Sequence, residues 1–370
     1  MSISLIESLI SELTSPDLVL LPEMAICSYM ASQAVWKYAD DCSKDTSAWT
    51  MRMAGFTMNG KTKIYARGGN SISCDLKSEK GEGLKAVVNS QNRREGMDKN
   101  KLIEMASSFV ETSDANYITN EMALSKNVSG LKMFEAPIFA FGEAEDDYFR
   151  KLKDKNVIGD HFLLPQEWLR EAKTVISFFL PFTTEVKKGN IKDLIWPSNE
   201  WLHARYEGQS FINKFCQYLS SELTRTGNKS VVPSLDDRFW SNTGDNSHID
   251  NLYTSNWSER HVAFVCGLGT FGLSKGLITS KGIAGRFGSI VTELYVSPDK
   301  REYGSIYEYC SMCGECGEKC PVRAISIEEG KNNKLCAAFL DETVEKFRPR
   351  YGCGKCQVGV PCESFIPQAR

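Results

Sequence analysis

The sequence predicts an α/β domain followed by a compact cysteine-rich domain, and three observations carry this prediction. Dense β-branched and aromatic runs alternate with long amphipathic segments in the middle of the chain, which is typical of strands and helices packed in layers. Eight of the 13 cysteines fall between Cys310 and Cys362. The composition, 42% hydrophobic and 25% charged, is that of a folded globular protein. Disordered, collagen-like and small disulfide-stapled proteins are therefore excluded.

Three parts are expected along the chain, because 370 residues exceed the usual size of one domain. Residues 1–130 form an α+β region to which we assign no role. Residues 131–300 form the α/β domain, and residues 301–370 form the cysteine-rich domain.

The α/β prediction rests on three segments. Residues 174–180 read Thr-Val-Ile-Ser-Phe-Phe-Leu and stop at Pro181, which predicts a strand buried on both faces. Apolar residues at spacings of three and four between 202 and 223, followed by Gly227, predict an amphipathic helix with a glycine stop. A second strand is expected at 291–296.

Charge and patterning also limit the surroundings of the protein. Lys and Arg total 44, Asp and Glu total 47, and the net charge of −3 gives no basic surface, so neither nucleic acid nor an anionic membrane is expected as a partner. Residues 1–18 show helical spacing interrupted by acids, without the basic start of a signal peptide or a twin-arginine pair. No run of 18 apolar residues predicts a membrane span. We expect a cytoplasmic protein, in which thiols stay reduced.

The cysteine-rich tail carries the strongest chemical signal. Its first part reads Cys310-Ser-Met-Cys313-Gly-Glu-Cys316-Gly-Glu-Lys-Cys320-Pro321. This is the C-x2-C-x2-C-x3-C-P run of bacterial ferredoxins, in which the fourth cysteine serves the other cluster of a pair. Four more cysteines follow in the sequence: Cys336, Cys353, Cys356 and Cys362. Eight thiolates predict two [4Fe–4S] clusters.

The interleaved pattern also predicts how the ligands divide. The first thiol set is Cys310, Cys313, Cys316 and Cys362, and the second thiol set is Cys320, Cys336, Cys353 and Cys356. Structural zinc is the alternative, but it usually takes two separated C-x2-C pairs, which fit the three consecutive cysteines less well. The scattered Cys27, Cys42 and Cys74 are expected to be inert.

A glycine-rich segment lies just before the tail. Gly267-Leu-Gly269-Thr-Phe-Gly272 matches the dinucleotide-binding fingerprint, but the residues that follow contain too much glycine to open the helix that such a site needs. Seven glycines occur between residues 267 and 288. They predict a backbone that a large flat ligand can approach closely. The candidate cofactor contacts are Gly267, Gly269, Gly272 and Lys275.

Four segments in this order resemble the epoxyqueuosine reductase and reductive dehalogenase superfamily of corrinoid iron–sulfur enzymes. They are residues 162–177, the pair Glu259-Arg260, the glycine motif and the cysteine tail, and the resemblance covers residues 131–370. It implies a nitroreductase-like α/β domain that holds a corrinoid (cobalamin) and a ferredoxin-like domain that passes electrons to it. The implied function is reductive cleavage of a small organic substrate, with electrons from an external ferredoxin or flavodoxin. The alternative is a non-corrinoid ferredoxin-type electron-transfer protein.

The resemblance also implies a proton donor. The donor aspartate of epoxyqueuosine reductases, counted back from Glu259-Arg260, falls near Tyr253, and the dehalogenases use a tyrosine in this role. Tyr253 is therefore the expected donor, with Asp250 as the alternative. Arg260 and Lys275 are the nearest basic residues in sequence that could stabilise its phenolate. The chain departs from the family in lacking helical repeats after the clusters and a corrinoid lower-ligand motif around its four histidines, which are expected to be surface or hydrogen-bonded residues.

Overall fold

The structure, a computed structural model, describes residues 60–65, 71–77, 85–89, 97–242 and 253–368. The chain divides into two compact units, Met1–Glu95 and Gly96–Arg370. In the first unit, three strands form an antiparallel sheet in the order β1-β2-β3: β1 (Gly60–Tyr65), β2 (Ser71–Lys77) and β3 (Lys85–Asn89). The N-terminal helix expected in residues 1–18, and the residues Cys27, Cys42 and Asp250, lie outside the described residues.

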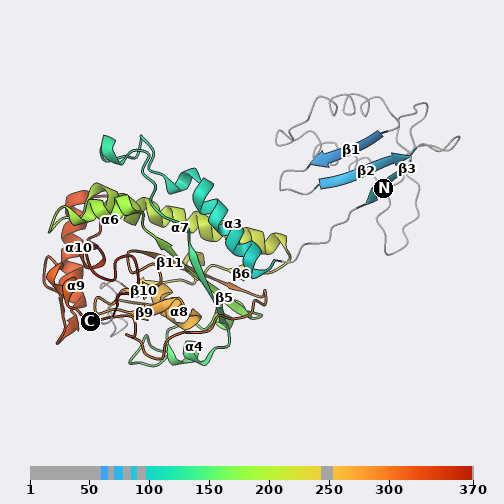
Figure 1. The fold of residues 1–370 in the computed structure, drawn as a ribbon. Coiled ribbons are helices and arrows are strands. Elements are labelled where there is room, and N and C mark those ends of the chain that lie inside the picture. The colour runs from blue at the N-terminus through green and yellow to red at the C-terminus, as the bar shows by residue number, and fades with distance from the viewer. Residues whose placement is uncertain (1–59, 66–70, 78–84, 90–96, 243–252, 369–370) are drawn as a thin grey trace. The chain divides into compact units, whose positions relative to one another are not determined.

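The second unit holds the mixed α/β fold that the sequence predicts (Figure 1). Its main helices are α3 (Lys99–Thr112), α4 (Asp147–Lys151), α5 (Pro165–Trp168), α6 (Thr184–Ile191), α7 (Asn199–Arg225), α8 (Glu259–Cys266), α9 (Glu315–Glu318) and α10 (Asn333–Phe347). Its strands are β4 (Ile138–Glu143), β5 (Thr174–Pro181), β6 (Ser230–Val231), β7 (Ser241–Asn242), β8 (Thr254–Ser255), β9 (Gly269–Phe271), β10 (Leu277–Thr279), β11 (Gly285–Thr292), β12 (Ile325–Ser326) and β13 (Gly330–Lys331). Short 3-10 turns lie at Asp114–Asn116, Lys126–Val128, Pro233–Leu235 and Lys355–Gln357.

The central sheet has the strand order β4-β5-β11-β6, and each of its neighbouring pairs is antiparallel. The predicted strand at 174–180 is confirmed as β5, whose eight residues are all buried. The predicted helix is confirmed as α7, and it ends just before Gly227, which takes a left-handed φ of 86°.

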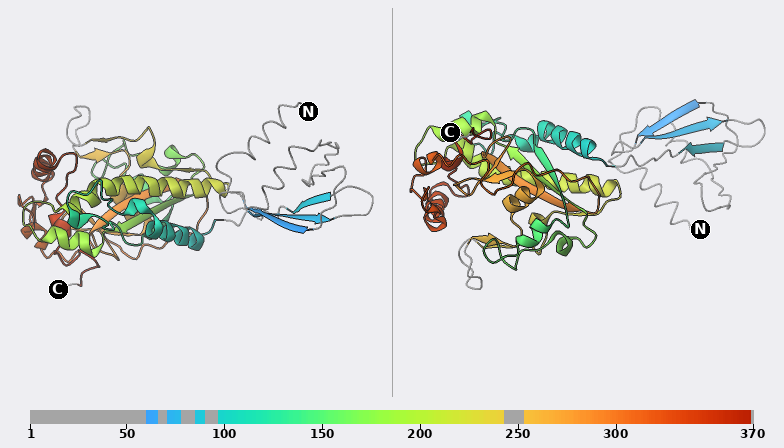
Figure 2. Two further views of the ribbon diagram at one scale, coloured as in Figure 1. Left: turned by 90° about the horizontal axis from the view of Figure 1, so that it is seen from above. Right: turned by 60° about the horizontal axis from the view of Figure 1, so that its bottom comes forward.

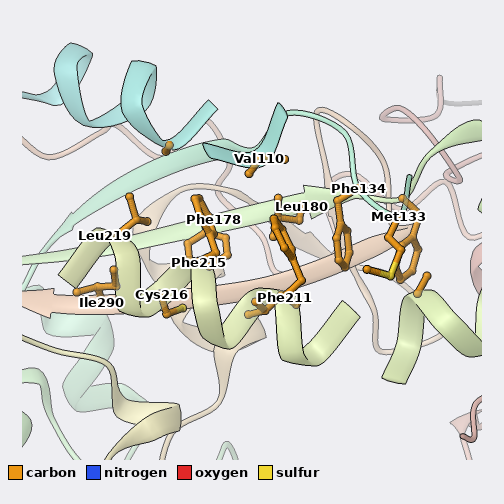
Figure 3. Packing of buried hydrophobic residues seen from close by; sticks show 14 of the residues in the cluster. Val110, Met133, Phe134, Phe178, Leu180, Phe211, Phe215, Cys216, Leu219 and Ile290 are labelled. Atoms are coloured by element: carbon orange, nitrogen blue, oxygen red, sulfur yellow. The ribbon is translucent and has the colours of Figure 1, made fainter. Parts of the chain in front are cut away.

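Both faces of the sheet are covered, which is why β5 lacks the polar alternation of a half-exposed strand. On one face, Phe178 and Leu180 of β5 and Ile290 of β11 pack against α7 and α3 (Figure 3). The ring of Phe178 meets that of Phe215 edge-on, with centroids 4.9 Å apart. On the other face, Val175, Phe179 and Val291 pack against the buried side of α8 and against Trp257.

The second predicted strand is displaced from the position that the sequence suggests. Residues 291–296 were the expected strand, but β11 spans Gly285–Thr292 and pairs along its whole length with β5. The strand was not expected at 285–290 because glycine has a low propensity for strands. In β11 the glycines are required, because a Cβ at Gly285 would lie 2.4 Å from a ring atom of Phe179, and one at Gly288 would lie 2.4 Å from a ring atom of Phe178.

The boundary between the two units also differs from the expected one near residue 130. Residues 97–130 belong to the second unit, where Leu102, Ala106 and Val110 of α3 and Ile118 are buried in the same core as the sheet. The amphipathic face of α3 has no core of its own, so it packs on the α/β layer. Residues 301–370 belong to the same compact unit as the sheet.

The tail is attached at the end of the unit where α7 begins (Figure 2). The backbone N–H groups of Ile283 and Ala284 donate to the carbonyls of Cys362 and Glu363, at 2.9 and 3.1 Å. Trp196 stacks on Phe339 of α10, with centroids 5.5 Å apart. Among the described residues, every helix is too short or too polar to cross a bilayer.

Candidate functional site

The first thiol set surrounds a small cavity. All four thiols line it: Cys310 and Cys313 from the loop before α9, Cys316 from α9, and Cys362 from the C-terminal loop. The loop turns tightly because Met312 and Gly314 take left-handed φ values of 50° and 80°. Burial raises the pKa of Cys316 and that of Cys362 to about 12, and the nearby thiols of the same set add to both shifts.

The glycine-rich segment forms the opposite wall of this cavity. It is lined from the β9–β10 hairpin and the residues just before β11 by Gly272, Leu273, Ser274, Ile278 and Ile283. The hairpin is held to the tail by the N–H of Phe271, which donates to the carbonyl of Ile306 at 2.7 Å. The segment predicted to face a flat cofactor therefore faces the first thiol set.

The second thiol set joins two turns of the tail to α10. Cys336 lies in the first turn of α10, and Cys320 precedes a turn in which the N–H of Ala324 donates to its sulfur at 3.2 Å. Cys353 lies just before the 3-10 turn Lys355–Gln357, and Cys356 lies within it. Burial raises the pKa of Cys353 to about 12, with the thiols of Cys356, Cys336 and Cys320 contributing in that order.

Lys355, between the last two of these cysteines, anchors the second thiol set to the α/β layer. It is 4% exposed, and its Nζ donates to the carbonyls of Asn190 and Asp193 at 2.7 and 2.8 Å. Asn190 in turn donates to the carbonyl of Cys353 at 2.9 Å. Burial lowers the pKa of Lys355, while the neighbouring Cys353 and Asp193 oppose that shift.

Neighbouring thiols influence the pKa values of the buried cysteines both within each set and between the two sets. Cys316 and Cys362 are influenced by Cys310 and Cys313, whereas Cys353 and Cys356 are influenced by Cys320 and Cys336. Cys356 also raises the pKa of Cys316, so the two sets adjoin. Within the described ranges, no three His, Cys, Asp or Glu side chains are arranged to hold a single metal ion.

The glycines assigned to a cofactor are explained by contacts inside the chain. A Cβ at Gly269 would lie 2.0 Å from the carbonyl oxygen of Ile278, and one at Gly272 would lie 3.2 Å from its Cδ1. Gly267 ends α8 with a left-handed φ of 106°. The motif follows a helix and enters a hairpin, which is the reverse of the strand–helix order of a dinucleotide site.

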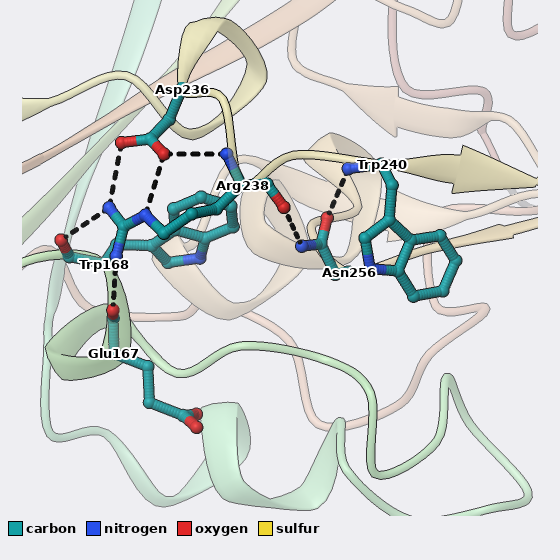
Figure 4. Close-up of polar contacts among 6 residues, drawn as sticks. All are labelled: Glu167, Trp168, Asp236, Arg238, Trp240 and Asn256. Atoms are coloured by element: carbon teal, nitrogen blue, oxygen red, sulfur yellow. Dashed lines mark hydrogen bonds and ion pairs between the residues drawn. The ribbon is translucent and has the colours of Figure 1, made fainter.

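The predicted proton donor lies at the edge of the described chain. Tyr253 is 37% exposed and has a left-handed φ of 70°. Arg260, one of the two basic residues expected to stabilise its phenolate, donates to the carbonyl of the other, Lys275, at 2.6 Å. Asn256, three residues after Tyr253, bonds to the backbone of Arg238 and Trp240 (Figure 4). Arg238 in turn bonds to Asp236 and to the carbonyls of Glu167 and Trp168.

The three described histidines are hydrogen-bonded, as expected. His161 contacts the hydroxyl of Thr254 at 2.8 Å, His203 accepts from the N–H of Leu124 at 3.0 Å, and His261 contacts the hydroxyl of Ser258 at 2.7 Å. His248 lies outside the described residues.

No family model matches the chain. A tetrachloroethene reductive dehalogenase of Desulfitobacterium hafniense is 32% identical over 114 residues, which is 28% of this chain and 20% of the dehalogenase. An epoxyqueuosine reductase of Bacillus cereus is 32% identical over 215 residues, 53% of this chain and 50% of the reductase. The chain thus spans half or less of the length of these relatives.

The sequence resembles epoxyqueuosine reductases and reductive dehalogenases. This confirms the resemblance predicted from the motifs. Among solved structures, an epoxyqueuosine reductase matches with a TM-score of 0.42 and 18% identity over 73% of this chain and 68% of its own. A catabolic reductive dehalogenase matches with a TM-score of 0.41 and 14% identity over 72% of this chain and 37% of its own.

The sequence used the pair Glu259-Arg260 as a landmark and assigned no role of its own to Glu259. Glu259 accepts from the hydroxyl of Ser289 at 2.7 Å, and Ser289 accepts from the indole of Trp257 at 2.9 Å. The other carboxylate oxygen is buried without a partner, as is the hydroxyl of Ser177, which pairs with Ser289 across the sheet. Burial raises the pKa of Glu259 to about 7, opposed by the Ser289 bond. The sequence signal that could have revealed this residue is an acidic side chain at the start of an apolar helix, since Glu259 is the first residue of α8.

Proposed function

We propose that the chain is an oxidoreductase in which two [4Fe–4S] clusters deliver electrons for the reductive cleavage of a substrate. The observation that carries this proposal is the cavity lined by Cys310, Cys313, Cys316 and Cys362, with four further cysteines in the same tail. Four cysteine thiols are the donor set of such a cluster, and each set offers them from an ordered loop framework. When bound, the clusters would supply one-electron transfer steps.

We infer an order for the two sets. Exposed apolar side chains flank the first set: Ile306, Tyr307, Met312 and Ile327 are between 39% and 56% exposed. The second set lies near Arg260, whose pKa is lowered by burial and raised by Cys356 and Cys336. An external ferredoxin- or flavodoxin-type donor would therefore deliver electrons to the first set, and the second set would pass them to the interior.

A corrinoid is proposed because the chain is similar to reductive dehalogenases, one of which is described as acting by B12-dependent dehalogenation. The cradle expected for it does not fit, since a Cβ at Gly269 or Gly272 would meet Ile278 and Gly267 ends α8 with a left-handed φ. The residues of this chain have defined tasks: the thiol sets hold the clusters, and Lys355 fixes the loop of the second set.

The substrate was expected to be a small organic molecule, with nucleic acid excluded by charge. A solved epoxyqueuosine reductase contains an epoxyqueuosine-modified tRNA stem loop, which runs against that expectation for one branch of the relatives. We propose reductive cleavage of a C–O or C–halogen bond, with Tyr253 as the proton donor. We also propose a cytoplasmic location, where thiols stay reduced.

The deciding experiment is anaerobic purification from cobalamin-supplemented cells, followed by analysis of iron, sulfide, cobalt and zinc. We expect about eight iron and eight sulfide per chain, the content of two cubanes. Cys313→Ala should remove one cluster signal and Cys353→Ala the other, whereas Cys216→Ala, outside both sets, should keep both. Stoichiometric zinc without iron would overturn the proposal. Two clusters without cobalt, and no uptake of added cobalamin, would leave the electron-transfer alternative.

A further inference from the structure

A buried tryptophan lies against the loop that carries Cys353 of the second thiol set. Trp201 is the third residue of α7 and is 3% exposed. The residues on either side of Cys353, Gly352 and Gly354, leave room for its indole ring. A Cβ at Gly354 would overlap the ring carbons Cζ2 and Cε2 and lie 2.6 Å from Nε1, and one at Gly352 would lie 3.5 Å from Cδ1 and from Nε1. The nitrogen edge of the indole therefore faces both residues that flank Cys353.

The ring and the loop are fixed to each other by short contacts. Ser198, the N-cap of α7, accepts from the backbone N–H of Trp201 at 3.2 Å. The N–H of Ser198 donates to the side-chain oxygen of Asn190 at 3.1 Å, and the amide nitrogen of Asn190 donates to the carbonyl of Cys353 at 2.9 Å. The ring of Phe182 meets the indole edge-on, with centroids 4.8 Å apart. The indole is therefore held in one place beside the loop.

The indole N–H of Trp201 is left without an acceptor. Its backbone N–H bonds to Ser198, but among the described residues no oxygen or sulfur accepts from its ring nitrogen. A buried indole N–H usually finds a hydrogen-bond partner, because an unpaired polar group inside a protein costs free energy. A donor that is fixed beside a metal-binding loop and lacks a partner within the chain is satisfied when the bound group supplies the acceptor.

We propose that Trp201 is a positioning residue of the second cluster, and that its indole N–H donates to a sulfur of that cluster. Hydrogen bonds to the sulfurs of an iron–sulfur cluster help to set its reduction potential, and they raise it because they stabilise the more negative reduced state. A raised potential favours electron flow from the first set to the second, which is the order proposed above. The inference rests on the proposed function, since the acceptor belongs to the cluster.

The test compares the reduction potentials of both clusters in the wild type and in Trp201→Phe, by EPR-monitored redox titration of the anaerobically purified full chain. Phenylalanine keeps an aromatic ring at this position and removes the N–H. We expect Trp201→Phe to keep about eight irons per chain, to lower the potential of the second cluster and to leave that of the first unchanged. The signals are assigned to the two clusters with Cys313→Ala and Cys353→Ala.

Trp168→Phe is the matched control. Trp168 is 4% exposed, and its indole N–H is also buried without a partner. It packs in the core on the other face of the sheet, against Trp257, with ring centroids 6.0 Å apart. Loss of this N–H should therefore leave both potentials at their wild-type values.

Isotope labelling tests the hydrogen bond without changing the packing. Tryptophan that carries the heavy isotope of nitrogen in its indole ring should add a nitrogen coupling to the pulsed EPR spectrum of the reduced second cluster. The coupling should persist in Trp168→Phe and disappear in Trp201→Phe. If Trp201→Phe loses the iron of the second set, the coupling in the wild type decides by itself.

The possible failures are distinguishable from one another. Wild-type protein that holds zinc and no iron would overturn the proposed function itself. Wild-type protein with both clusters but no coupling would overturn only the hydrogen bond from Trp201; a shifted potential in Trp201→Phe would then assign the effect of the ring to packing.

Discussion

Replacing Gly269 with alanine should destabilise the protein and disrupt the first cluster site together. The added Cβ would lie 2.0 Å from the carbonyl oxygen of Ile278 and 2.8 Å from its carbonyl carbon. Both are backbone atoms of the opposite strand, so no side chain can rotate away. The register that pairs Gly269 with Thr279 and Thr270 with Ile278 must then open.

The size of the effect follows from comparison with a second glycine of the same motif. Overpacking usually costs about 1–3 kcal/mol, and because the obstruction at Gly269 is backbone, we expect about 3 kcal/mol or more of unfolding free energy. At Gly272 the nearest atom is Cδ1 of Ile278, 3.2 Å away at the end of a flexible side chain. Gly272→Ala should therefore cost about 1 kcal/mol or less.

Urea unfolding and iron analysis together form the assay. Ile278 lines the cavity of the first thiol set, so Gly269→Ala should also lower the iron content from about eight toward about four per chain, since each cubane holds four irons. Gly272→Ala should keep its iron. A Gly269→Ala protein with wild-type stability and iron that fails only to take up cobalamin would refute this reasoning and restore the ligand-contact interpretation of the glycines.

Three further variants test the remaining assignments. Tyr253→Phe should keep both cluster spectra and lower turnover by ~10²–10⁴, the usual contribution of a general acid; unchanged turnover, with a collapse in Asp250→Asn, would move the role to the aspartate. The pKa of Glu259 is raised to about 7 in the folded chain, so the stability that its carboxyl group contributes is full below its ordinary pKa of 4.5 and is lost as the pH rises through 7. The free energy of unfolding should therefore decline on the order of 2 kcal/mol between pH 5 and 8, and Glu259→Gln should flatten this decline in denaturant melts. An unaltered pH profile in Glu259→Gln would contradict the assignment. Lys355→Met should leave buried carbonyls unpaired, cost about 1–3 kcal/mol and release the iron of the second set first, whereas the exposed Lys334→Met should match the wild type in both measurements.

Helices and strands whose residue pattern alone requires them could be predicted from the sequence. The run at 174–180 is β-branched or apolar except at Ser177, as a doubly covered strand requires, and the spacing of apolar residues in 199–225 matches one helical face. The start of β11 could not be predicted in this way, because glycine has a low propensity for strands. The glycines are needed there because the aromatic rings of β5 pack against them, and this contact exists only in the folded sheet. The unit boundary after Glu95 was not predicted for a related reason. The sequence shows that α3 has an apolar face but not that this face packs on the central sheet.

The sequence by itself determined the number, order and spacing of the thiols, because loops with two-residue gaps bring their own cysteines together. Only the tertiary structure decided what surrounds them. It turned the glycine motif toward the first thiol set, and it joined Lys355, in the loop of the second thiol set, to the carbonyls of Asn190 and Asp193. These contacts join residues that lie far apart in the sequence and share no local pattern, so they depend on how the tail packs on the α/β layer.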